Sequence, residues 1–211
     1  MKEFKLDQVR RILCLGAHSD DIEIGCGGTL LKLIRDHKNL EILWVVFSAG
    51  GARTREARQS ASEFLAGAAK KRIVVKTFRG SFFPYQGERI KDYFESLKSF
   101  QPDLVFTHYR DDRHQDHRVL SDLAWNTFRD HAVLEYEIPK YDGDLGVPNV
   151  FVQLDEELCR RKIASLLNHF QTQANKHWFS DQTFRALMRL RGVECAAEYA
   201  EAFYGRKLVV G

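Results

Sequence analysis

The sequence predicts an α/β fold, in which a mainly parallel sheet carries helices on both faces. Short runs of β-branched and aromatic residues alternate with segments in which apolar residues recur every three or four positions. Neighbouring parallel strands need crossover connections, and these are nearly always right-handed, so the alternation favours helices on both faces. A chain of 211 residues with 44% hydrophobic and 29% charged residues is also typical of one globular domain.

The runs and the periodic segments define the elements of the first part of the chain. Strands are expected at residues 12–15, 41–47, 73–77, 104–107 and 133–137. Helices are expected between them, at residues 28–37, 55–69, 88–100 and 116–131. The basic run Lys70, Lys71 and Arg72 is expected at the end of the second helix, where positive charge complements the helix dipole. The loop at 78–86, which is rich in aromatic residues, is expected to wall a pocket.

The regular alternation stops after residue 137. A turn-rich segment at 138–146 precedes a strand at 150–153, and helices at 155–173 and 181–191 lead to a closing strand at 203–210. The chain contains no repeat and no convincing linker. We therefore expect a single domain over residues 1–211, with a core at about 1–137 and a C-terminal extension at about 138–211 that shapes the substrate site.

Composition and charge exclude several classes of protein. The 32 Lys and Arg residues exceed the 29 Asp and Glu residues by only three, which is too little to indicate a nucleic-acid partner. The longest apolar stretches, at 12–17 and 42–47, are too short for a membrane span or an export signal. The four cysteines form no CxxC pair, so we expect buried, reduced thiols and a cytoplasmic location.

Acidic residues and a histidine follow the first expected strand. The segment 16–29 contains His18, Asp20, Asp21 and Glu23. In an open parallel sheet, ligands bind at the carboxyl ends of the strands, and carboxylates are costly to bury there unless they are paired or bind a metal. The same carboxylates would repel a pyrophosphate, so the glycines of this segment do not indicate a dinucleotide site.

A second cluster, with His114, Asp116 and His117, follows the fourth expected strand. If the strand order reverses between the first and fourth strands, the two clusters lie side by side. A metal ion could then bind His18, Asp21 and His117 and keep a fourth position for water, as catalytic zinc does. Taken singly, these residues have ordinary alternatives as loop histidines or helix caps. The other histidines, including His108, receive no assigned role.

These residues resemble the motifs of the PIG-L/LmbE-like N-acetyl-sugar deacetylases. The family signature AHPDDxE corresponds to residues 17–23, with Ser19 in the place of the usual proline. The HxDH motif corresponds to residues 114–117, and the RxxEA motif to residues 53–57. The resemblance covers roughly the first 130 residues. Ser19 makes the turn more flexible but removes no metal ligand.

The resemblance implies a Rossmann-like fold and a metal-dependent hydrolase. The reaction implied is removal of the N-acetyl group from an N-acetylglucosamine-type sugar or sugar conjugate, with release of acetate and a free amine. One Zn²⁺ per chain is implied, with Fe²⁺ or another divalent ion as an alternative. Its implied ligands are His18, Asp21 and His117.

The resemblance also implies catalytic and substrate-binding roles. Asp20 would act as the general base, and His114 would stabilise the oxyanion or the leaving amine, with Asp116 orienting His114. The sequence leaves open whether Asp20 or His114 protonates the amine. The resemblance implies that Arg53 and Arg113 contact the substrate.

The aromatic side chains Tyr141 and Trp178 lie in irregular segments and are expected to stack on a sugar ring, although packing is the ordinary role of such residues. The expected partner is a small acetamido sugar, and the sequence leaves open a homo-oligomer. Three other functions remain open: an amidase of a larger amino-sugar conjugate, a non-catalytic carbohydrate-binding relative, and a metal phosphoesterase. The last would need two hard cations, whereas the histidine-rich set favours a single zinc ion.

Overall fold

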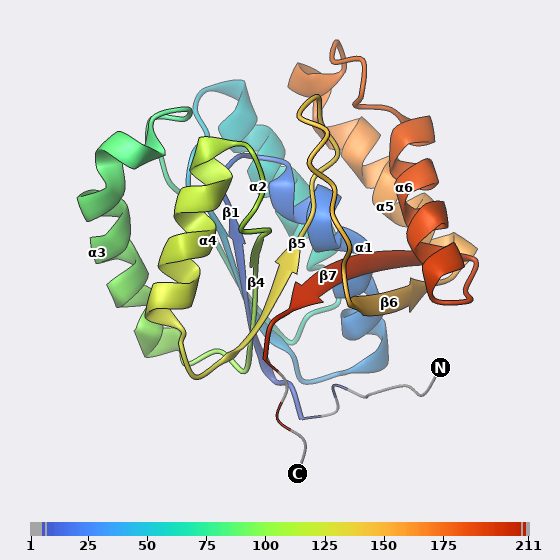
Figure 1. The fold of residues 1–211 in the computed structure, drawn as a ribbon, viewed down its shortest axis with the longest axis horizontal. Coiled ribbons are helices and arrows are strands. Elements are labelled where there is room, and N and C mark those ends of the chain that lie inside the picture. Colours follow the sequence, from blue (N-terminus) through green and yellow to red (C-terminus); the bar gives the residue numbers. More distant parts are fainter. Residues whose placement is uncertain (1–5, 7, 208, 210–211) are drawn as a thin grey trace.

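A seven-stranded sheet forms the centre of the protein in the computed structural model, which describes residues 6, 8–207 and 209 (Figure 1). The strands lie in the order β3-β2-β1-β4-β5-β7-β6. The first five strands are parallel, and β7 is antiparallel to both of its neighbours. The fold class expected from the sequence is therefore confirmed. The strands are β1 (Arg11–Gly16), β2 (Glu41–Val46), β3 (Lys70–Val75), β4 (Leu104–His108), β5 (Ala132–Tyr136), β6 (Val150–Leu154) and β7 (Tyr199–Gly205).

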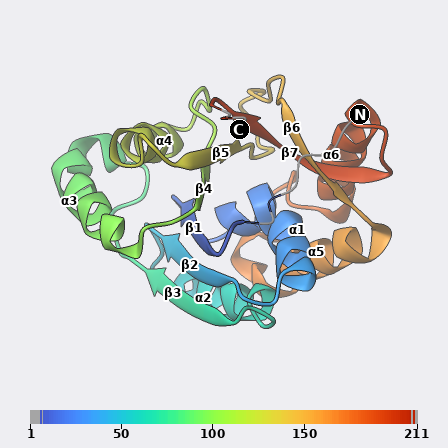
Figure 2. The same ribbon diagram turned by 90° about the horizontal axis from the view of Figure 1, so that it is seen from below.

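Helices cover both faces of the sheet. Figure 2 shows α3 and α4 on one side and α1 and α5 on the other. Alternate residues of each central strand point to opposite faces: Leu13 and Leu15 of β1 pack with α3 and α4, whereas Ile12 and Cys14 pack on the opposite face. The helices are α1 (Asp21–Asp36), α2 (Ala52–Phe64), α3 (Gly87–Leu97), α4 (Gln115–Thr127), α5 (Glu156–His169) and α6 (Asp181–Glu194), and the short 3₁₀ helices are η1 (Phe83–Gln86), η2 (Lys98–Phe100) and η3 (Gln171–Gln173).

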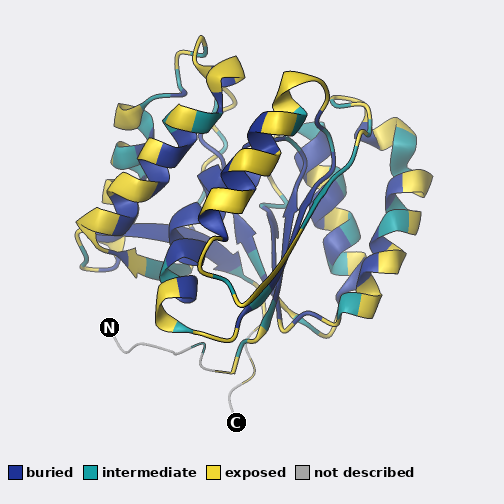
Figure 3. Cartoon of the chain, turned by 180° about the vertical axis from the view of Figure 1, so that it is seen from behind, coloured by how far each residue is buried: buried dark blue, intermediate teal, exposed yellow. Residues whose placement is uncertain are grey.

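The buried residues form two apolar layers, one on each side of the sheet. Figure 3 shows the sheet buried throughout its centre and the outer helix faces exposed. All four cysteines are buried and free. Within the described residues, no helix is both long and apolar enough to cross a membrane.

Two local expectations for the first part of the chain are wrong. Lys70, Lys71 and Arg72 do not end a helix: α2 ends at Phe64, and the three residues form the exposed first half of the edge strand β3. Charged residues on an edge strand discourage pairing with another chain, which gives this run a physical role there. The second difference is in α1, which begins at Asp21 rather than at residue 28 because its glycine-rich segment is helical on both sides of one break.

The C-terminal extension completes the sheet. Strand β7 lies between β5 and β6, and α5 packs against α1 and α2. The observed strand begins at Tyr199 and ends at Gly205, so the expected closing strand is displaced toward the N-terminus. Residues 208 and 210 of the expected strand lie outside the described residues. The order of strands also reverses between β1 and β4, and this reversal places the ends of these two strands next to each other.

Candidate metal centre

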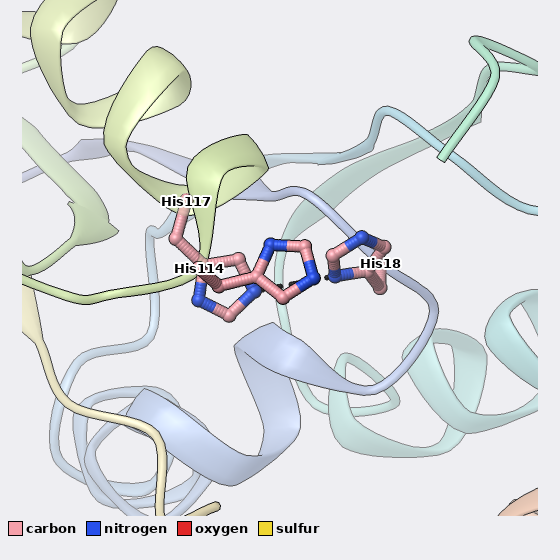
Figure 4. Close-up of side chains that lie close together, drawn as sticks. All are labelled: His18, His114 and His117. Carbon is pink, nitrogen blue, oxygen red and sulfur yellow. Dashed lines mark hydrogen bonds between the residues drawn. The ribbon is translucent and has the colours of Figure 1, made fainter. Parts of the chain in front are cut away.

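Two segments that are far apart in the sequence meet at the carboxyl ends of β1 and β4. His18 lies in the turn after β1, and Asp21 begins α1. His114 is the N-cap residue of α4, and His117 lies in the first turn of that helix. Because β1 and β4 are hydrogen-bonded neighbours, these turns face each other. Figure 4 shows the rings of His18, His114 and His117 close together.

The ligand trio, defined as His18, Asp21 and His117, has the dimensions of a metal site. His18 Nδ1 lies 3.2 Å from His117 Nε2 and 3.4 Å from Asp21 Oδ2. The third side of the triangle, from His117 Nε2 to Asp21 Oδ2, is 3.6 Å. A point equidistant from three atoms in such a triangle lies about 2.0 Å from each, which is the length of zinc bonds to histidine nitrogen and carboxylate oxygen. The residues present therefore fit a zinc ion.

The charges around the trio also suit a cation. Burial and the nearby His108 lower the pKa of His117 to about 3, so this imidazole is neutral and offers a lone pair. Burial opposes the ionisation of Asp21, but the neighbouring imidazole rings, chiefly that of His117, hold its pKa well below the usual value. Burial likewise opposes charge on His18, but Asp21 and Asp116 raise its pKa to about 10. The site attracts positive charge, and a divalent cation would replace the proton on His18.

A carboxylate orients each histidine of the trio through the ring nitrogen that faces away from the centre. His117 Nδ1–H donates to Asp112 Oδ2 at 2.9 Å, which leaves Nε2 free to face the trio. His18 Nε2–H donates to Asp116 Oδ2 at 3.0 Å, which turns Nδ1 toward His117 Nε2, 3.2 Å away. Histidine ligands of metal ions usually carry such a partner, because it fixes the tautomer and the ring orientation.

The structure departs from the expectation for Asp116. Its carboxylate accepts hydrogen bonds from the backbone N–H groups of Ser81 at 2.5 Å and Phe83 at 3.1 Å, as well as from His18. It is the backbone N–H of Asp116 that contacts His114, donating to Nδ1 at 3.2 Å. His114 caps α4, so its ring turns back onto its own helix. The Asp116 carboxylate therefore orients His18 and not His114.

Asp20 lies beside the trio and has the properties of a proton acceptor. Its side chain is only 6% exposed, and it makes no capping hydrogen bond to α1 although it occupies the N-cap position. The ordinary role of a helix cap is therefore not the one it fills. Burial and the negative charge of Asp21 raise the pKa of Asp20 to about 6. A carboxylate with this pKa is ionised at neutral pH and is a stronger base than an exposed aspartate.

Sequence reasoning missed His108. It is the last residue of β4 and is fully buried, with its ring stacked on His117 at a centroid distance of 3.9 Å. His108 Nε2 lies 3.3 Å from Asp21 Oδ2, so Asp21, His108 and His117 form a second group of potential ligands. The N–H of Ala17 donates to the same nitrogen at 3.0 Å. Because this bond occupies the Nε2 lone pair, His108 packs beside the trio and is not one of its ligands.

Sequence reasoning also missed Asp112, which orients His117. Its Oδ1 accepts the backbone N–H of His114 at 2.7 Å, and its Oδ2 accepts Lys140 Nζ at 3.0 Å in addition to His117. The signal available in the sequence was a carboxylate placed two residues before the HxDH motif. Lys140 brings the segment after β5 into this network.

The comparisons with known proteins identify the family. Residues 13–128, more than half of the chain, match the PIG-L family, described as GlcNAc-PI de-N-acetylase. The chain belongs to this family. It is 29% identical over 175 residues to the uncharacterized deacetylase YaiS of Escherichia coli (strain K12), a match that covers 75% of this chain and 89% of YaiS. The family match and this relative support a hydrolytic N-deacetylase.

Two solved structures have the same fold. The N,N'-diacetylchitobiose deacetylase of Pyrococcus horikoshii has a TM-score of 0.73 at 22% identity, over 93% of this chain and 84% of that one. The conserved protein TT1542 of Thermus thermophilus has a TM-score of 0.74 at 19% identity, over 96% of this chain and 97% of that one.

The four expected substrate-binding residues lie outside the ligand trio. Arg53 is exposed in the first turn of α2, and Arg113 is exposed beside the HxDH motif. Tyr141 is 72% exposed, and Trp178 is half-buried against Phe179. Among the described residues, no hydrogen bond or ring contact joins these four to the trio. Their roles remain predictions that need a bound substrate.

The loop at 78–86 lies against the site, and its expected role as a pocket wall stays a prediction. A side chain at Gly80 would place its Cβ 3.0 Å from Ser48 Oγ and 3.8 Å from His18 Cδ2. The ring of Phe83 stacks on His18 at a centroid distance of 6.2 Å. Asp116 fixes this loop through two backbone amides, so the loop and His18 share one anchor.

The glutamate of the PIG-L RxxEA motif has a structural role. Glu56 is buried, and its carboxylate accepts the backbone N–H of Thr172 at 3.0 Å and the hydroxyl of Thr172 at 2.6 Å. Thr172 belongs to η3, which precedes the segment that carries Trp178. Glu56 thus ties the second helix of the core to the C-terminal extension.

Proposed function

We propose that this chain is a zinc-dependent hydrolase that removes the N-acetyl group from an N-acetylglucosamine-type sugar or sugar conjugate, releasing acetate and a free amine. The ligand trio carries the proposal, because two imidazoles and one carboxylate converge with the dimensions of a zinc site at a sheet edge where substrates bind. When bound there, zinc would polarise the amide carbonyl and lower the pKa of water.

Asp20 is the proposed general base. Its carboxylate takes a proton from the attacking water while the amide carbon receives the new bond to oxygen. A pKa of about 6 suits this task near neutral pH, because the group is then ionised and still basic. Asp20 directly precedes Asp21, so the base and the ligand are held by the same helix start.

His114 is the proposed donor to the carbonyl oxygen. Its Nδ1 accepts the backbone N–H of Asp116 at 3.2 Å, so the proton of the neutral ring lies on Nε2. Burial and the charge of His18 lower the pKa of His114, which favours this neutral form. A neutral His114 stabilises negative charge on oxygen by a hydrogen bond. We therefore assign to Asp20 the return of its proton to the departing nitrogen.

Recognition of the sugar is proposed for four residues outside the ligand trio. Arg53 and Arg113 offer charged donors to hydroxyl or anionic groups, and Tyr141 and Trp178 offer rings for stacking. The cytoplasmic location also stays a prediction.

Metal analysis followed by product analysis tests the proposed function. The purified protein is expected to contain one divalent ion per chain and to release acetate and amine in equal amounts from an N-acetylglucosamine derivative. A chelator should stop the reaction, and one equivalent of zinc or Fe²⁺ should restore it and identify the preferred ion. A longer acid in place of acetate would indicate an amidase of larger conjugates. Binding of the sugar without product would indicate a carbohydrate-binding protein.

A further inference from the structure

Helix α1 is interrupted one turn after the catalytic residues. Cys26 has non-helical backbone angles, φ −143° and ψ 15°. In a continuous helix, the N–H of Gly28 would donate to the carbonyl of Ile24. Here the Gly28 N–H donates to Glu201 Oε1 at 2.8 Å, and the Ile24 carbonyl accepts Lys162 Nζ at 2.6 Å. The side chains of Lys162 and Glu201 therefore replace the backbone hydrogen bond between Gly28 and Ile24.

Both partners of this pair come from the C-terminal extension. Lys162 lies in α5 and Glu201 in β7, and they are 3% and 4% exposed. Lys162 Nζ is 2.6 Å from Glu201 Oε1, and Glu201 Oε2 also accepts the N–H of Thr29 at 2.6 Å. The carboxylate thus caps the second half of α1, where the helix dipole favours negative charge.

The buried ion pair of Lys162 and Glu201 carries a large desolvation penalty, so stability of the core alone does not explain it. Removing two charges from water costs several kcal/mol for each ion, and apolar side chains of similar volume often give equal or greater stability. The pair here meets this cost with hydrogen bonds to three backbone groups of the broken helix. This arrangement indicates that its role is the geometry of α1.

The ion pair acts on the first turn of α1. The N–H of Ile24 donates to the carbonyl of Asp20 at 3.0 Å, which closes a single turn carrying Asp20 and Asp21. Lys162 binds the last carbonyl of this turn. Gly25 allows the broken segment to lie close to the sheet, because a Cβ at this position would lie 2.1 Å from Tyr136 Cδ2. The direction of the turn is therefore set from outside the helix.

We propose that Lys162 and Glu201 are positioning residues that hold α1 open between Ile24 and Gly28, and so direct Asp21 toward His117. Within the described residues, the hydrogen bonds and ion pairs of Lys162 and Glu201 do not include the ligand trio. The inference rests on the metal site of the proposed function.

The double variant K162M/E201L tests this inference. It removes both charges and leaves the Gly28 N–H free to bond to the Ile24 carbonyl, which allows the helix to close. We expect a folded protein with a melting temperature near that of the wild type. Its zinc affinity should fall by at least about tenfold, since the carboxylate ligand is displaced. The rate constant kcat should fall more than KM changes.

Two further double variants complete the experiment. K162M/E201Q keeps one oxygen acceptor, which can serve only one of the Gly28 and Thr29 amides, and should lose less zinc affinity than K162M/E201L. R191M/E137L is the matched control, because Arg191 of the extension and Glu137 at the end of the core form another buried pair, with two bonds of 2.7 Å, but no hydrogen bond described for the two side chains reaches α1. Its zinc affinity should equal that of the wild type.

Zinc affinity is measured by competition with a chromophoric chelator, and folding by circular dichroism. Wild-type zinc affinity in folded K162M/E201L, or an equal loss in the R191M/E137L control, would overturn the inference. Failure of both Lys162 and Glu201 double variants to fold would also overturn it, because the pair would then belong to the stability of the whole domain. A wild-type protein that binds no zinc would instead refute the proposed function.

Discussion

Replacing Asp112 by asparagine tests how the chain prepares His117 as a ligand. Asp112 is 2% exposed and uses both carboxylate oxygens: Oδ1 accepts the His114 N–H at 2.7 Å, and Oδ2 accepts His117 Nδ1–H at 2.9 Å. An asparagine has one acceptor oxygen. If that oxygen serves His114, the amide NH₂ faces His117 Nδ1 and favours the tautomer with a proton on Nε2. That proton occupies the position of the ligand lone pair.

The expected loss is about 10- to 100-fold in zinc affinity, which is the usual cost of losing the partner of a ligating histidine. This loss corresponds to about 1.4–2.8 kcal/mol. The value agrees with the cost of about 1–3 kcal/mol for a buried donor left unsatisfied. Competition with a chromophoric chelator at about pH 7.5, where the unliganded imidazole is neutral, measures the affinity. Thermal unfolding confirms that the variant is folded.

Asp111→Asn provides the matched control for this prediction. Asp111 is the adjacent residue, is exposed, and loses the same charge. Its replacement should leave zinc affinity unchanged, because Asp111 does not contact the trio. Wild-type zinc affinity in Asp112→Asn would refute the reasoning that the Asp112 contact prepares His117. An equal loss of zinc affinity in both variants would also refute it, because the loss would then follow from net charge.

Three other perturbations give independent tests. Asp20→Asn should retain zinc but lower kcat by at least about 100-fold, because it removes the general base; near-native turnover would refute that role. In the wild type, kcat/KM should fall as the pH is lowered through about 6, because Asp20 must be ionised to accept a proton; a flat profile between about pH 8 and pH 5 would contradict it. Gly25→Ala should destabilise the fold by about 1–3 kcal/mol in urea unfolding, since the new Cβ would overlap the buried Tyr136 ring, whereas Gly50→Ala, where no heavy atom lies within 4 Å, should have little effect; equal stabilities would show that the core adapts.

The sequence predicted the meeting of His18, Asp21 and His117 on the condition that the strand order reverses between the first and fourth strands. The alternation of strands and helices implied a parallel sheet, and the two acidic, histidine-containing turns both followed strands. Reversal of the strand order between β1 and β4 then places His18 and Asp21 beside His117. Hydrophobic periodicity indicates strands and helices but not the order of strands in the sheet, so the strand order came from the structure.

The hydrogen-bond network around the trio could not be predicted in the same way. The Asp116 carboxylate turns to His18 because the loop at 78–86 supplies two backbone amides, and the position of that loop depends on tertiary packing. His108 was missed because its side chain is buried at a strand end, where a histidine most often serves packing. The basic run at 70–72 was placed on a helix because its charges do not distinguish a helix end from an exposed sheet edge.

The order of strands in the sheet has a consequence for synthesis of the chain. Strand β6 is hydrogen-bonded only to β7 within the described sheet, and β7 also covers the edge of β5. Residues 150–154 therefore have no strand partner until residues 199–205 have left the ribosome. During this interval the parallel part of the sheet is already available, and its β5 edge is open to other chains. We expect folding to finish with the insertion of a late strand between two earlier ones.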